Sequence, residues 1–127
     1  MPRTTVRLFR EKNGEAPLGV WLAELERHER KVHDKCVQRI LLLSQLGSEL
    51  RRPFTDMLRD GIRELRVRVG SVNYRILYFF HGANAVCLSH GLKKVGRVPD
   101  SEIETALVRK KLVERDPQSH VSDWEVL

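Results

Sequence analysis

Basic side chains gather between Ile62 and Arg97, a stretch in which Glu64 is the only acidic residue. An arginine guanidinium offers a fixed fork of N–H donors that matches the oxygens of a phosphate group. Donors of this kind stabilise the negative charge that develops on a phosphoryl group during phosphodiester cleavage. The stretch therefore favours phosphate or nucleic-acid chemistry, and the alternative is a solvated basic surface without a ligand. Its basic residues are Arg63, Arg66, Arg68, Arg75, Lys93, Lys94 and Arg97.

A β-hairpin is predicted to position these arginines. Apolar and polar residues alternate from Ile62 to Val69 and from Val72 to Phe80, and Gly70-Ser71 separates the two runs as a tight turn. In this register Arg66 lies directly opposite Arg75 on one face of the sheet. Like charges directly opposite each other destabilise a sheet. We therefore expect this face to lack an internal counter-ion and to be neutralised by an external polyanion.

The same register predicts the neighbours of the arginine pair. Arg68 lies opposite Asn73 on the same face, and the opposed pairs of the apolar face are Val69–Val72, Val67–Tyr74 and Leu65–Ile76. The basic residues at the ends of the strands extend the surface that an RNA backbone could contact. The predicted RNA-binding residues are Arg63, Arg68, Asn73, Lys93 and Arg97.

Metal-free RNA cleavage also needs proton transfer, because the ribose 2′-hydroxyl attacks the adjacent phosphate. His90 titrates close to neutral pH, and neighbouring arginines would lower the pKa of Lys93 or Lys94. The length of the turn before the third strand, over residues 81–84, leaves two registers open for that strand. In one register His90 joins the arginine face; in the other it is a packed strand histidine and Ser89 takes its place.

Metal catalysis is not expected. A two-metal route needs clustered carboxylates, and Glu64 is a single one. His33 and Cys36 are spaced like a pair of metal ligands on a helix, but no second pair completes such a site. We therefore predict an enzyme without a metal ion or another cofactor.

Composition limits the remaining function classes. The chain has 127 residues, of which 41% are hydrophobic and 31% charged, and its formal net charge is +6. These values are typical of one globular domain with nucleic acid or an acidic protein as its partner. No apolar run approaches the roughly 18 residues that span a bilayer, and no signal core follows the N-terminus. Two cysteines are too few for a disulfide framework. We expect a cytoplasmic protein.

The order of elements predicts an α+β domain over residues 1–115. A short strand over residues 4–9 precedes two amphipathic helices, which begin near Pro17 and end at Gly47. Residues 48–60 are predicted to be a loop that leads into three antiparallel strands, and a last helix follows Pro99. The expected architecture is a small antiparallel sheet packed against the N-terminal helical hairpin, with a C-terminal helix. Residues 116–127 are predicted to be a polar tail that contains Trp124.

Several motifs resemble one family when they are taken together. They are Glu64-Leu65-Arg66 through Tyr74-Arg75, His90-Gly91-Leu92-Lys93-Lys94, and Pro99 followed by Glu102-Ile103. This set resembles the RelE/HigB superfamily of toxins, particularly its phage-derived Gp49-like branch. The resemblance extends from about Val6 to Lys111, and the element order predicted from periodicity is similar to that RelE-like fold.

The resemblance implies the toxin of a type II toxin–antitoxin system. Such toxins act as ribosome-dependent mRNA interferases: they cut mRNA in the ribosomal A site, and an antitoxin, often a helix-turn-helix protein, neutralises them. By resemblance and by the chemistry above, the expected catalytic residues are Arg66, Arg75, His90 and Lys94. Several relatives carry an aromatic residue or histidine where this chain has Pro99-Asp100. The alternatives are a non-catalytic RNA-binding module and a scaffold that recognises an acidic protein.

Overall fold

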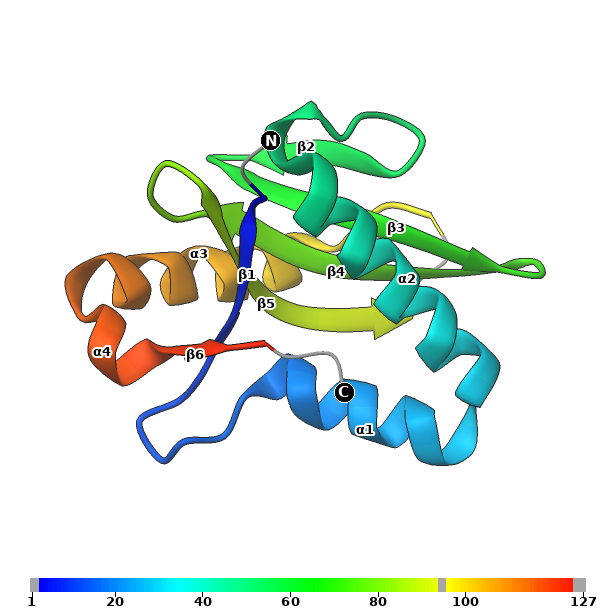
Figure 1. The fold of residues 1–127 in the computed structure, drawn as a ribbon, viewed down its shortest axis with the longest axis horizontal. Helices are drawn as coiled ribbons and strands as arrows, with labels where there is room; N and C mark the ends of the chain where they lie inside the picture. Colours follow the sequence, from blue (N-terminus) through cyan, green and yellow to red (C-terminus); the bar gives the residue numbers. More distant parts are fainter. Residues whose placement is uncertain (1–2, 94–95, 125–127) are drawn as a thin grey trace.

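The computed structural model describes residues 3–93 and 96–124 of the chain. Four of its strands follow one another in the chain between an N-terminal and a C-terminal group of helices, which confirms the predicted α+β fold class (Figure 1). In chain order they are β1 (Thr5–Phe9), α1 (Pro17–His28), α2 (Arg30–Leu46), the 3-10 helix η1 (Gly47–Glu49), β2 (Thr55–Arg59), β3 (Ile62–Val69), β4 (Val72–Phe80), β5 (Ala85–Lys93), α3 (Asp100–Arg115), α4 (Pro117–His120) and β6 (Val121–Asp123).

All described strands belong to one sheet, in the order β2-β3-β4-β5-β1-β6. Neighbouring strands are antiparallel except for β1 and β5, which are parallel. The hairpin β3–β4 has the predicted register: Val69 pairs with Val72, and Arg66 pairs with Arg75. The alternation of the sequence and the Gly70 turn, where φ is +63°, are sufficient to fix this pairing.

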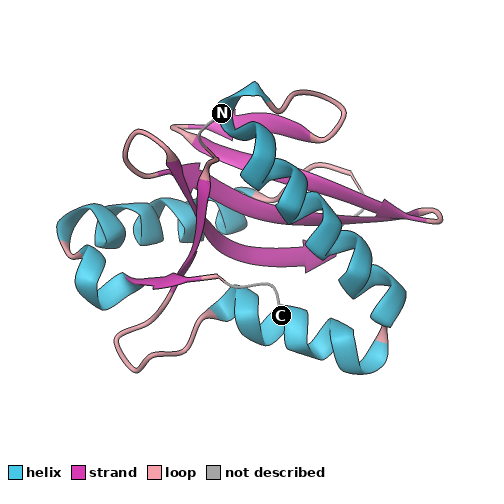
Figure 2. Ribbon diagram, viewed as in Figure 1, coloured by secondary structure: helices cyan, strands magenta, loops and turns pink. Residues whose placement is uncertain are grey.

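Helices cover both faces of the sheet (Figure 2). The hairpin of α1 and α2 packs on one face, where its apolar stripes meet the predicted apolar face of β3 and β4. Helix α3 packs on the other face, against a second apolar cluster that contains Leu77, Phe79 and Ile103. The arginine pair extends this second cluster along the same face because Arg75 and Leu77 alternate with the residues that face α1 and α2.

A close approach between α1 and β5 depends on a glycine. The ring of Trp21 lies directly over Gly91, and a Cβ atom at that position would overlap the ring. Trp21 also lies 6.5 Å from Tyr74, measured between ring centroids. Gly91 therefore allows the helical hairpin to pack at its observed distance from the sheet.

The structure adds a strand where the sequence predicted only a loop. Residues 55–59 form β2, which pairs with β3 and is the outer strand of the sheet. Asp60 and Gly61 make the turn between them with φ values of 51° and 85°, as a type I′ hairpin requires. The expectation of a loop was wrong for these residues because their side chains are mostly polar and do not alternate clearly.

The segment after residue 115 also differs from the expected polar tail. It forms α4 and then β6, which pairs with β1 through Phe9–Val121 and Leu8–Ser122. The buried ring of His120 stacks on Phe9, with 5.6 Å between ring centroids. Trp124 packs against the core beneath α1 and α2. Docking of the His120 ring and of Trp124 thus orders a segment whose composition is polar.

Candidate functional site

The arginine pair shares a buried carboxylate. Glu64 is only 1% exposed and lies on β3 two residues before Arg66, so the two side chains share a face. Its Oε1 accepts hydrogen bonds from Arg66 Nε at 2.6 Å and from Arg75 Nη1 at 2.7 Å, and its Oε2 accepts from Arg75 Nη1 at 3.0 Å. The prediction that this face lacks an internal counter-ion was therefore wrong. Glu64 removes the repulsion that two opposed arginines would otherwise cause.

A second carboxylate comes from the strand that the sequence did not predict. Asp56 on β2 pairs with Glu64 in register, and its Oδ2 accepts from Arg66 Nη2 at 3.1 Å. Asp56 also binds Arg52, with 3.0 Å between Oδ2 and Nη2. The hydrogen bond from Arg52 is the main cause that lowers the pKa of Asp56. A chain of alternating charges thus runs from Arg52 to Arg75 across β2, β3 and β4.

This arrangement, which we call the arginine cluster (Arg52, Asp56, Glu64, Arg66 and Arg75), keeps an excess of positive charge. Three guanidinium groups face two carboxylates. The Arg66 side chain is 39% exposed and the Arg75 side chain 14%. Hydrogen bonding to Glu64 is the main cause that raises the pKa of Arg66.

Some donors of the pair have no partner among the described residues. Arg66 binds the two carboxylates through Nε and Nη2, and Arg75 uses Nη1 for both bonds to Glu64. The buried Nε of Arg75 has no hydrogen-bond acceptor within the described part of the chain. Glu64 therefore holds the two guanidinium planes in place, while Arg66 Nη1 and Arg75 Nη2 remain available to a ligand.

His90 faces α3 because the pairing of β4 with β5 is irregular. Leu77 pairs with His90 and Tyr78 pairs with Leu88, so Ser89 is an extra residue on β5. As a result Ser89 and His90 both face α3. His90 therefore joins the arginine face, as one of the two registers left open by the sequence predicted, and the extra residue turns Ser89 toward α3 as well. The His90 side chain is 12% exposed.

Both ring nitrogens of His90 have partners. Nδ1 lies 2.7 Å from Ser89 Oγ, and Nε2 lies 2.9 Å from Oε1 of Glu102 on α3. Arg109 Nη1 donates to Ser89 Oγ at 3.3 Å. These contacts fit a neutral ring that donates from Nε2 to Glu102 and accepts from Ser89 at Nδ1. Burial lowers the pKa of His90, against the hydrogen bond to Glu102, so the neutral form is favoured.

The other predicted site residues are divided between the two faces. Arg68 and Asn73 are opposed beside the arginine pair, and Arg68 Nε donates to the carbonyl oxygen of Gly70 at 3.1 Å. Arg63 and Lys93 pair with Tyr78 and Tyr74 and thus lie on the side of α1 and α2.

Two predicted residues follow β5 in the sequence. Arg97 is 87% exposed, and its Nη2 is 3.8 Å from Oδ1 of Asp100. Lys94, a predicted catalytic residue, lies outside the described residues.

Sequence reasoning missed several charged residues of this face: Asp56, Glu102 and Arg109. The dipeptide Asp60-Gly61, a strong hairpin signal directly before β3, could have revealed β2 and with it Asp56. Glu64 lies two residues before Arg66 on the same strand, so alternation alone places the two side chains on one face. No local signal could have placed Glu102 and Arg109, because they approach the sheet from another element.

Two further findings concern metal ions and membranes. Among residues 3–93 and 96–124, no three His, Cys, Asp or Glu side chains are grouped closely enough to hold a metal ion. In the same ranges no helix has the length and apolar character needed to cross a bilayer.

Comparison with known proteins identifies the family. Residues 21–111 match the model of the phage-derived protein Gp49-like family. The matched region covers most of the chain and includes β3, β4 and β5. The chain is 31% identical over 87 residues to "Probable endoribonuclease HigB1" of Mycobacterium tuberculosis, in the strains CDC 1551 / Oshkosh and ATCC 25618 / H37Rv. The aligned region covers 67% of this chain and 70% of each relative. The chain therefore belongs to the Gp49-like family, within the RelE/HigB superfamily of toxins.

Proposed function

We propose that this protein is an endoribonuclease and the toxin of a type II toxin–antitoxin system. The observation that carries the proposal is the arginine cluster, in which Glu64 holds two guanidinium groups side by side at a partly exposed position. The relationship to a probable endoribonuclease supports the same activity. We further propose that the substrate is mRNA on the ribosome, cut in the A site.

In the proposed reaction the 2′-hydroxyl oxygen of a ribose attacks the adjacent phosphorus. The bond between phosphorus and the 5′-oxygen of the next nucleotide breaks, which leaves a 2′,3′-cyclic phosphate and a 5′-hydroxyl group. A base takes the proton of the 2′-hydroxyl, and an acid gives one to the 5′-oxygen. Arg66 and Arg75 donate from Nη1 and Nη2 to the phosphoryl oxygens, whose charge grows in the transition state.

His90 and Lys94 are the proposed proton-transfer residues. The neutral ring of His90 is the form that accepts a proton, and its lowered pKa supports this assignment. Its nitrogens are bound to Ser89 and Glu102, so one of these contacts must open before His90 reaches the RNA. Glu64 is a positioning residue in this scheme, since it orients the two arginines without contacting the substrate.

We propose two partners and a location that agree with this role. The proposed partners are mRNA on the ribosome and a cognate antitoxin, of the helix-turn-helix type that the HigB-like branch uses. The proposed location is the cytoplasm, where translating ribosomes are found.

Primer extension in a reconstituted translation system tests the proposal. Wild-type protein is added to one mRNA, either free or engaged by ribosomes, and new 5′ ends are mapped. We expect new 5′-hydroxyl ends only in the ribosome-bound sample. Binding of RNA without new ends in either sample would instead favour the non-catalytic RNA-binding module. New ends on free RNA at the same rate would refute ribosome dependence.

A further inference from the structure

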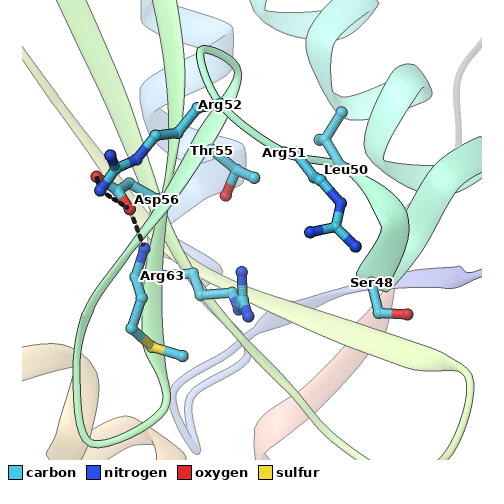
Figure 3. Close-up of a pocket in the computed structure, with 8 residues that line it drawn as sticks. Ser48, Leu50, Arg51, Arg52, Thr55, Asp56 and Arg63 are labelled. Carbon is cyan, nitrogen blue, oxygen red and sulfur yellow. Dashed lines mark hydrogen bonds and ion pairs between the residues drawn. The ribbon is translucent and has the colours of Figure 1, made fainter.

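A pocket of about 560 Å³ opens at the β2 edge of the sheet (Figure 3), and Thr55, Met57 and Arg63 line it from the face that α1 and α2 cover. It lies between the segment after η1 and the strands β2 and β3. Three arginines line it, with one carboxylate among its walls. Its lining consists of Ser48, Leu50, Arg51, Arg52, Thr55, Asp56, Met57 and Arg63.

Two of these arginines differ from those of the arginine cluster. Within the described residues, neither Arg51 nor Arg63 has an acidic side chain within ion-pair distance, whereas Arg52 is bound to Asp56. Figure 3 shows the guanidinium groups of Arg51 and Arg63 directed into the space between the loop and the sheet. An anion that enters the pocket therefore meets two cations without a counter-ion. The sequence predicted such a pair of unneutralised arginines for the face that carries Arg66 and Arg75.

The floor of the pocket is fixed by neighbouring contacts. Thr55 is buried, donates to the carbonyl oxygen of Glu64 at 2.8 Å, and lies 2.7 Å from the hydroxyl oxygen of Tyr78. The Arg63 guanidinium carbon is 5.8 Å from the centroid of the Phe80 ring. The contact with the Phe80 ring limits the conformations of the Arg63 side chain and leaves its guanidinium group directed at the opening of the pocket. Little side-chain entropy is therefore lost when an anion binds.

The pocket is continuous with the arginine cluster through Asp56. Asp56 Oδ2 binds Arg52 at the pocket and Arg66 in the cluster, at 3.0 and 3.1 Å. The two basic surfaces lie on opposite faces of the sheet at its β2 edge, because Arg63 is on the side of α1 and α2 and Arg66 is on the side of α3. A polynucleotide carries a negative charge at every linkage, so a chain that places one phosphate at Arg66 has further phosphates to place nearby.

We propose that this pocket binds a backbone phosphate of the RNA that the protein cuts, in addition to the phosphate held by Arg66 and Arg75. The inference rests on the proposed function for the identity of the RNA. The pocket acts by charge and by the guanidinium fork and reads no base, so its contribution is independent of sequence. An acidic protein segment is the competing occupant, and the experiment separates the two.

The test measures binding of a labelled single-stranded RNA of about twelve nucleotides, a length within the usual site sizes of single-strand binding proteins. Its riboses carry 2′-O-methyl groups, which block the attacking oxygen, so binding is observed without cleavage. Dissociation constants are determined by fluorescence anisotropy over a range of salt concentrations. The pocket variant is Arg51→Gln/Arg63→Gln. The matched control, Arg27→Gln/Arg30→Gln, loses the same charge from exposed positions on the helical hairpin.

Loss of two phosphate contacts has a calculable effect. Each contact with single-stranded nucleic acid contributes about 0.7 to the slope of log affinity against log salt. The pocket variant should lose about 1.4 from this slope and bind about 25-fold more weakly at 0.1 M salt. Arg51→Gln alone, at an exposed position that does not endanger folding, should lose about half the slope and bind about 5-fold more weakly. The control should change affinity by less than about 3-fold, because its contribution is only long-range.

Equal slopes for the pocket and control variants would overturn the proposal. Unchanged RNA binding together with lost binding of a labelled poly-glutamate peptide would also overturn it and would assign the pocket to an acidic protein. Failure of the proposed function would be seen in the primer-extension experiment, where wild-type protein would produce no new 5′ ends on ribosome-bound mRNA. A protein that binds RNA through the pocket and cuts nothing would therefore retain the inference and refute the activity.

Discussion

Replacing Glu64 by Gln should destabilise the fold and disorganise the arginine cluster. The substitution keeps the shape of the side chain but removes its charge, and the –NH2 group replaces one acceptor with a donor. Breaking a buried ion pair by removing one partner costs about 3–5 kcal/mol. Arg75 is almost buried beside Glu64, so its contact contributes most of this value. Arg66 is 39% exposed and contributes less because solvent screens it.

We expect Glu64→Gln to lower the free energy of unfolding by about 3 kcal/mol in urea titrations. The control Glu24→Gln breaks an exposed pair with Arg27 and should cost less than about 1 kcal/mol. In the double variant Glu64→Gln/Arg75→Gln the loss should be clearly smaller than the sum of the two single losses, by at least about 1 kcal/mol.

The same variant should separate binding from cleavage. Removing the negative charge makes the face more positive, so affinity for the methylated RNA should be retained or rise. Cleavage should fall, because the two guanidinium groups are no longer held in one geometry. A Glu64→Gln protein with unchanged stability, or one that cuts RNA as fast as wild type, would refute the positioning role of Glu64.

Three further predictions concern other parts of the structure. The pKa of His90 in the folded protein lies below its ordinary value of 6.5, so as the pH falls the unfolded chain takes up the His90 proton before the folded protein does. The free energy of unfolding should therefore fall as the pH drops through 6.5, and it should fall less steeply in His90→Gln. A steeper fall in the variant in urea titrations would contradict this reading. Gly91→Ala should cost about 2 kcal/mol and alter Trp21 fluorescence, since the added Cβ overlaps the ring; full stability would contradict that packing. Burial raises the pKa of the Cys36 and Cys87 thiols to about 12. A thiol reagent should therefore label the native protein slowly and the urea-unfolded protein at once, and equal labelling rates would refute the burial of these two cysteines.

The hairpin was predictable because its information is local. Alternation in both strands and a two-residue turn fix the register, and a shift by one residue would expose the apolar face. The counter-ion is not evident from the pairs that lie directly opposite each other in the hairpin, where Arg66 meets Arg75. Glu64 reaches Arg75 from the diagonal position on the same face, where long side chains still meet.

The surroundings of His90 could not be predicted, since they depend on an irregularity and on a distant helix. One extra residue in β5 turns both Ser89 and His90 toward α3, which no alternation pattern anticipates. The strand β2 was missed for a different reason: as an outer strand with largely polar residues it lacks the apolar periodicity of a buried strand.

The most direct test of the account is the single-turnover rate of mRNA cleavage on ribosomes by Arg66→Gln. Arg66 is partly exposed, so this variant should fold, and urea titration verifies that it does. Loss of one charge-stabilising donor should slow cleavage by about 10²–10³-fold. The control Arg27→Gln, on an exposed face of α1, should cut at the wild-type rate. A folded Arg66→Gln protein that cuts as fast as this control would contradict the claim that the arginine cluster is the catalytic centre.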